Sequence, residues 1–119
     1  MKRNHRSLKA WQLGIDLVER VYSTTATFPR AEIFGLAAQM RRAAVSVPSN
    51  IAEGFARTGT RELVRFLGIA AASLSELDTH VEIARRLGYL KDTLLADRID
   101  EVAAVLMGLD ASLKRRLKG

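Results

Sequence analysis

A run of seven apolar residues at helical spacing constrains the fold more than any other feature of the sequence. Its steps alternate between four and three residues, which places every member on one face of a helix. The run comprises Leu63, Leu67, Ala70, Leu74, Leu77, Val81 and Ala84. A second stripe with similar spacing comprises Leu95, Ile99, Val102, Leu106, Leu109 and Leu113. Two long amphipathic helices are therefore predicted, over residues 60–87 and 93–117.

The segment between these stripes has the residues that end one helix and start another. Gly88 suits the left-handed position that follows a helix C-terminus, and Asp92 is a favourable cap for the next helix. A connection this short places the two helices side by side and antiparallel. Thr60 is the predicted cap of the earlier of the two helices.

The first half of the chain predicts two more helices, over residues 7–27 and 31–54. Pro29 cannot continue the first of them. Pro48 lies within the second, where it either kinks or splits the helix; because the apolar spacing continues across Pro48, we favour a kinked but continuous helix. We expect Trp11 and Tyr22 to be buried. The apolar stripes are Leu8, Trp11, Ile15, Val18 and Tyr22, then Phe34, Leu36, Met40, Ala44, Val47 and Ile51.

The pattern as a whole predicts an all-α protein, an antiparallel up-down-up-down four-helix bundle that forms a single domain over residues 1–119. The alternating β-branched pattern of strands is missing. The chain has no Cys, so it has no disulfide, thiolate metal site or Cys nucleophile, and this suits a reducing compartment. No signal peptide or membrane span is readable, and we expect a cytoplasmic protein without a membrane partner.

Small residues surround one turn of the third predicted helix, at Ala70, Ala71, Ala72 and Ser73. Alanine has the highest helix propensity, which is one explanation. The other is that this helix packs on more than one side, within the bundle or against another subunit. The sequence leaves both explanations open.

A search for catalytic residues favours a protein that is not an enzyme. Di-metal four-helix bundles use two Glu-x-x-His pairs, whereas Glu76 and His80 are four residues apart and no second pair exists. Ser73 and Ser75 lie within a helix, which is the wrong setting for a nucleophile. The segment 54–59 lacks the lysine and the preceding strand of a nucleotide-binding loop. We therefore predict no catalytic residues, no metal and no cofactor.

The charge of the chain is consistent with a polyanionic partner. Lys and Arg number 19 against 13 Asp and Glu, a formal charge of +6. In an antiparallel bundle, three basic groups lie at the same end: Lys2, Arg3, Arg6 and Lys9; Arg57, Arg61 and Arg65; and Lys114, Arg115, Arg116 and Lys118. These residues either make the protein soluble and complement a helix dipole, or bind nucleic acid. Aromatic residues make up only 6%, so any such binding is expected to use phosphates with little sequence preference.

One continuous motif carries a family resemblance. Residues 39–54 read QMRRAAVSVPSNIAEG, followed by Arg57, and a second block reads FLGIAAASLSEL over residues 66–77, with LGYL at residues 87–90. This arrangement resembles the four-helix bundle proteins encoded in 23S rRNA intervening sequences. Their pattern is an Arg-rich stretch, then Ser-x-Pro-x-Asn-Ile-Ala-Glu-Gly, then Arg. The chain departs from it at Ala72, where the family usually has Gly.

The resemblance implies a homopentameric ring of four-helix bundles without enzymatic activity. A distantly similar group, the accessory variability proteins of retroelements, binds nucleic acid and a reverse transcriptase through basic surfaces. Arg41 and Arg42 of the Arg-rich stretch therefore join the candidate nucleic-acid-binding set formed by the second and third basic groups, Arg57, Arg61, Arg65, Lys114, Arg115, Arg116 and Lys118.

Pro48, Asn50, Glu53 and Gly54 form the structural part of the motif. Asn50 and Glu53 are predicted to lock the helix end by hydrogen bonds near Arg57 and Arg42, and this role is favoured over direct ligand contact. The leading hypothesis is a non-catalytic, basic, oligomeric scaffold that binds RNA or DNA, with association with rRNA as one form of this role. The alternative is a protein-interaction module that serves a polymerase-like or reverse-transcriptase-like partner.

Overall fold

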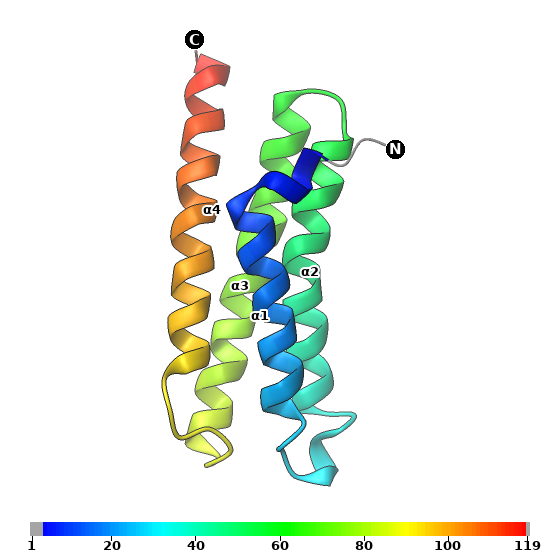
Figure 1. Cartoon of the computed structure of the whole chain (residues 1–119), viewed down its shortest axis with the longest axis vertical. Helices are drawn as coiled ribbons and strands as arrows, with labels where there is room; N and C mark the ends of the chain where they lie inside the picture. Colours follow the sequence, from blue (N-terminus) through cyan, green and yellow to red (C-terminus); the bar gives the residue numbers. More distant parts are fainter. Residues whose placement is uncertain (1–3, 119) are drawn as a thin grey trace.

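Four long helices run alternately up and down in the computed structural model, which describes residues 4–118 (Figure 1). They are α1 (Lys9–Thr25), α2 (Leu36–Ala56), α3 (Thr60–Arg86) and α4 (Leu94–Lys118), with two short 3₁₀ helices, η1 (Asn4–Ser7) and η2 (Arg30–Glu32). Residues 4–118 contain no strand. The predicted all-α class is confirmed.

The two stripes of the second half of the chain form much of the core. Every member of the α3 stripe is buried, and Leu67 and Leu77 are almost completely enclosed. In α4, Leu106 is also almost completely enclosed, whereas Leu109 is only half-buried. The period of 3.6 residues therefore identifies the inward face of both helices correctly.

The inward face of α1 differs from the predicted one. Its buried residues are Ala10, Gly14, Leu17, Val21 and Thr25. Trp11 is only half-buried, and Tyr22 is 45% exposed, so the expectation that both are buried was wrong. The reason is that α1 carries two adjacent apolar stripes. The stripe with the smaller residues packs inward because it lets α1 approach α2 closely.

Pro48 lies at that close approach. A Cβ atom added to Gly14 of α1 would lie 3.4 Å from the Cβ atom of Pro48, an ordinary contact at the limit of close packing. α2 runs unbroken through Pro48, as favoured from the spacing, and Pro48 itself is buried. The proline ring thus fills the space that Gly14 leaves open.

The start of α2 was predicted too early. The helix begins at Leu36 and not at residue 31, and η2 and a turn precede it. The Glu32 carboxylate accepts a hydrogen bond from the backbone N–H of Leu36 at 3.1 Å through Oε1, which satisfies one donor at the new helix start. Phe34, which was assigned to the inward stripe, is 96% exposed in this turn.

Two of the three predicted helix signals agree with the structure. Gly88 has φ +82°, and the N–H groups of Gly88 and Tyr89 donate to Arg85 O and Ala84 O, which is a Schellman motif. The Asp92 carboxylate accepts a hydrogen bond from the N–H of Leu94. Thr60 is not a cap, because it is already the first residue of α3.

Gly59 occupies the cap position of α3 instead, with φ +92°. A side chain is rarely tolerated at this φ, and glycine adopts it without strain.

A single carboxylate joins the two loops at the end of the bundle opposite η1 and the last turns of α4 (Figure 1). Glu32 accepts a hydrogen bond from the Tyr89 hydroxyl at 3.0 Å through Oε2, while its Oε1 holds the start of α2. This hydrogen bond raises the pKa of Tyr89 above its ordinary value. The Phe28 and Tyr89 rings lie 5.2 Å apart beside it. We call the Glu32–Tyr89 pair the loop clasp.

Across residues 4–118, the helices do not combine the length and apolarity needed to cross a membrane.

Candidate nucleic-acid interface

The signature motif on α2 makes its polar contacts within the bundle. The Ser46 and Ser73 hydroxyl oxygens lie 2.8 Å apart and join α2 to α3. The Asn50 amide donates to Ser46 O at 2.7 Å and to the Ser46 hydroxyl at 2.9 Å. Asn50 is therefore a structural residue that braces Ser46. The predicted contact between Asn50 and the arginines is not formed.

α2 and α3 approach each other closely at Gly54. A Cβ atom there would lie 2.9 Å from Phe66 Cβ and 3.0 Å from Leu63 Cδ1. Contacts this short force a neighbour to move, so only glycine fits without rearrangement. Gly54 thereby places the turn that follows α2 directly against the first two turns of α3.

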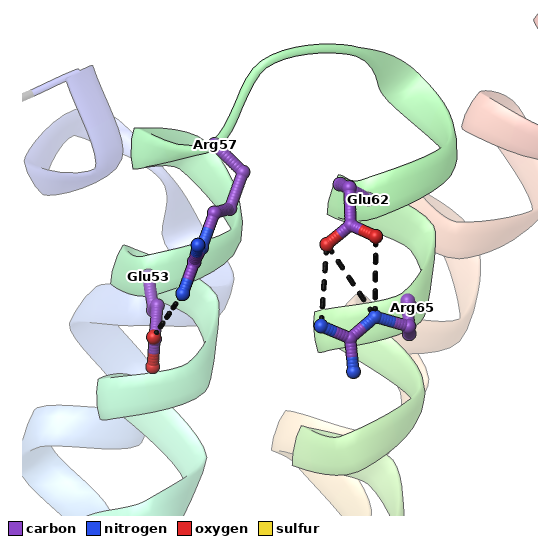
Figure 2. Close-up of polar contacts among 4 residues, drawn as sticks. All are labelled: Glu53, Arg57, Glu62 and Arg65. Carbon is purple, nitrogen blue, oxygen red and sulfur yellow. Dashed lines mark hydrogen bonds and ion pairs between the residues drawn. The ribbon is translucent and has the colours of Figure 1, made fainter.

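Arg57 in this turn and Arg65 in α3 rest against one buried ring. The Cζ atoms of Arg57 and Arg65 lie 5.1 Å and 4.6 Å from the centroid of the Phe66 ring, within cation–π range. Each guanidinium also has its own glutamate, as Figure 2 shows. Arg57 donates to Glu53 Oε1 at 2.8 Å, and Arg65 donates to both oxygens of Glu62 at 3.2–3.4 Å.

We call Arg57, Arg61 and Arg65, together with Phe66, the arginine turn. All three arginine side chains are exposed, and Arg61 pairs with no carboxylate within residues 4–118. The predicted junction is therefore correct for Glu53 and Arg57. Phe66 was not predicted as part of the site, although its place three residues after Leu63 marks it as inward-facing.

The basic end of α4 lies at the same end of the bundle as the arginine turn (Figure 1). Lys114 pairs with Asp110 at 2.8 Å. Arg115, Arg116 and Lys118 are exposed and pair with no carboxylate in the described part of the chain. Of the N-terminal basic group, Arg6 and Lys9 lie in the described part of the chain, whereas Lys2 and Arg3 lie outside the described residues.

Arg41 is separated from this group. It lies near the start of α2, towards the opposite end of the bundle, where its Nε donates to the Thr25 hydroxyl at 2.9 Å. Its guanidinium also covers the Tyr22 ring, with Cζ 4.6 Å from the centroid. Arg41 therefore fastens α2 to the last turn of α1. Arg42 is exposed and is likewise distant from the arginine turn along α2.

His80 is buried in α3, and its Nδ1 has no hydrogen-bond partner among the described residues. Burial lowers the pKa of His80, since it disfavours the charged imidazolium; the nearby Glu76 carboxylate raises it, and Arg42 lowers it further. In residues 4–118, no three His, Asp or Glu side chains gather in a group that could hold a metal ion.

The chain matches a known protein family in sequence and a solved structure in fold. The family model described as 23S rRNA-intervening sequence protein matches residues 6–109. A solved structure from Bacteroides thetaiotaomicron, described as a protein with unknown function from the S23 ribosomal protein family, aligns with a TM-score of 0.65 and 16% sequence identity. The alignment covers 92% of this chain and 99% of that one, and it supports the fold alone. No curated protein matches the chain.

Proposed function

The chain belongs to the 23S rRNA-intervening sequence protein family, and from that premise we propose that it is a non-catalytic basic scaffold that binds RNA or DNA through phosphate contacts. The observation that carries the proposal is the arginine turn, with three exposed guanidinium groups at the end of the bundle that also holds the basic end of α4. Guanidinium groups suit phosphates because their planar donors match two oxygens at once.

The ion pairs on the arginine turn are compatible with this role. The side chains of Arg57 and Glu53 are 50% and 48% exposed, and those of Arg65 and Glu62 are 58% and 45% exposed. Ion pairs this exposed contribute little to stability, so a phosphate can replace the carboxylate at small cost. Stacking on Phe66 holds the guanidinium groups in place during that exchange.

The scaffold is further proposed to be a homo-oligomer, and the family resemblance implies five subunits. Half-buried and exposed apolar side chains along one face of α1 and α2 support self-association, including Trp11, Ile15, Val18 and Val45. Light scattering on the purified protein tests this part separately. A monomer mass at micromolar concentration would contradict it.

The nucleic-acid proposal is tested by the salt dependence of binding to a structured RNA. Each phosphate that is neutralised releases counterions, so the logarithm of the affinity falls linearly with the logarithm of the salt concentration. Replacing Arg57, Arg61 and Arg65 together by Ala is expected to reduce that slope by about 2–3, at roughly 0.7–0.9 per lost phosphate contact.

A matched control removes the same charge at the opposite end, with Arg85→Ala, Arg86→Ala and Lys91→Ala. Arg86 forms an exposed ion pair with Glu82 in the same i, i+4 geometry as Arg57 with Glu53, so the control also loses a comparable pair. Equal losses of binding in both variants would contradict a site at the arginine turn. Absence of binding by the unaltered chain at low salt would contradict the function itself.

A further inference from the structure

The middle of the α3–α4 hairpin has the opposite charge to the rest of the chain. Seven of the 13 acidic residues of this basic protein lie within residues 66–84 and 94–113, and the two segments together contain one cation, Arg98. The acidic residues are Glu76, Asp78, Glu82, Asp97, Asp100, Glu101 and Asp110. This region repels a polyanion, so the nucleic-acid proposal does not account for it.

A groove of about 440 Å³ runs between α3 and α4 in this acidic region. Its floor is apolar and includes Leu74 and Ile99. Ala71 and Ala103 line its sides, and Asp78 of α3 and Asp100 of α4 also line it. Both aspartates are exposed, and neither pairs with a cation within the described residues.

The exposed methionine of the groove and two glycines on the same helices are not explained by packing within the bundle. Met107 lines it and is 68% exposed. Exposed methionines are typical of surfaces that bind peptides, because the flexible thioether adapts to a partner. A Cβ atom added to Gly68 or Gly108, on the same two helices, would meet nothing within 4 Å, so internal packing does not require glycine at either position.

We propose that this groove binds a basic amphipathic helix of a partner polypeptide. A channel between two helices with an apolar floor matches the apolar stripe of a third helix, and small residues such as Ala71 and Ala103 permit a close approach. The carboxylates of Asp78 and Asp100 match Lys or Arg residues that flank such a stripe. Ala71, within the cluster of small residues on α3, thereby acquires a contact outside the bundle.

The proposal is tested with a fluorescein-labelled 18-residue helical peptide that has Leu and Ala along one face and Lys on both flanks. Fluorescence anisotropy with the full chain is expected to show saturable binding. A scrambled peptide of the same composition and a peptide with Glu in place of Lys are expected to bind at least tenfold more weakly. Equal affinity for the scrambled peptide would overturn the proposal, since charge alone would then explain binding.

Two pairs of matched variants locate the binding site. Asp78→Asn with Asp100→Asn is expected to weaken binding about tenfold, whereas Asp16→Asn with Glu19→Gln, on a separate groove beside Arg20 and Arg98, removes the same charge and is expected to leave binding unchanged. Ala71→Trp is expected to block the groove. Ala72→Trp, on the next residue, which is also exposed but lies outside the groove, is expected to have no effect.

A second copy of this chain is the competing occupant, and one labelling experiment distinguishes it. The chain has no cysteine, so Met107→Cys introduces a single thiol. The thiol is expected to react with a maleimide at the same rate at low and high protein concentration, and to be protected by the basic peptide. Protection that appears with protein concentration alone would overturn the proposal by assigning the groove to self-association.

Discussion

The α2–α3 pair and helix α4 use different means of packing in the same bundle. α2 and α3 come together at Gly54 with no room for a methyl group, and they share the hydrogen bond between Ser46 and Ser73. α4 meets its neighbours through apolar contacts alone. Within residues 4–118, no side-chain hydrogen bond or ion pair joins it to another helix.

The burial of the helices shows the same contrast. α2 buries nine of its 21 residues and often two adjacent ones, whereas α4 buries five of its 25 and no two adjacent ones. The buried residues of α4 are Leu95, Ile99, Val102, Leu106 and Leu113. Small residues permit close packing, and close packing then permits specific polar contacts. A helix that relies on large apolar residues leaves grooves beside it, such as the one at Met107.

Core truncation is expected to give the largest difference between the two regions. Leu77→Ala in α3 removes a completely buried side chain at the centre of the core and is expected to cost about 4 kcal/mol of unfolding free energy. Leu113→Ala, near the exposed end of α4, is expected to cost about 2 kcal/mol because the site can collapse. Urea denaturation measures both values. Equal costs would contradict the tighter packing of α3.

Adding a methyl group at two glycines is expected to give opposite signs. Gly54→Ala pushes Phe66 and Leu63 of α3 away from α2 and is expected to destabilise the protein by about 1–3 kcal/mol. Gly108→Ala in α4 meets open space and is expected to stabilise it by up to about 1 kcal/mol through helix propensity. Urea denaturation measures both changes. A loss of stability at both positions would contradict the expected difference between Gly54 in α2 and Gly108 in α4.

The pH dependence of stability is expected to give the smallest effect. Because the pKa of His80 is lowered from 6.5 in the folded chain, the unfolded chain binds this proton more readily as the pH falls below 6.5. The stability that comes from burying neutral His80 is therefore fully present above pH 6.5. It is lost as the pH falls towards the pKa of His80 in the folded chain. His80→Gln is expected to flatten the pH profile below pH 6.5. An unchanged profile would contradict the burial of a neutral imidazole in α3.

The sequence predicted the regular parts of the fold well. α3 and α4 each have a single apolar stripe, so their inward faces follow from periodicity. α1 has two neighbouring stripes, and periodicity cannot choose between them. The choice depends on the contact between Gly14 and Pro48, which are far apart in the chain. The late start of α2 depends on a hydrogen bond of Glu32 that no periodic pattern contains.

The charges of the candidate site were predictable, but of its contacts only the pair of Glu53 and Arg57 was. Antiparallel topology is enough to place Arg57, Arg61 and Arg65 at one end with the last turns of α4. That Arg41 is held by Thr25 depends on the register of α2 against α1, which the sequence leaves open. The sequence also leaves open that Arg57 and Arg65 share the Phe66 ring, because the angle between α2 and α3 at Gly54 decides where both arginines lie.

The loop clasp has a consequence for how the molecule responds to force. The described N-terminal helix η1 and the last turns of α4 lie at the same end of the bundle, and the Glu32–Tyr89 hydrogen bond lies at the other end (Figure 1). Pulling on both termini therefore peels α1 and α4 from the bundle one turn at a time, instead of shearing whole helices at once. The tension reaches the clasp last, so the far end of the bundle is the part that keeps its shape longest under load.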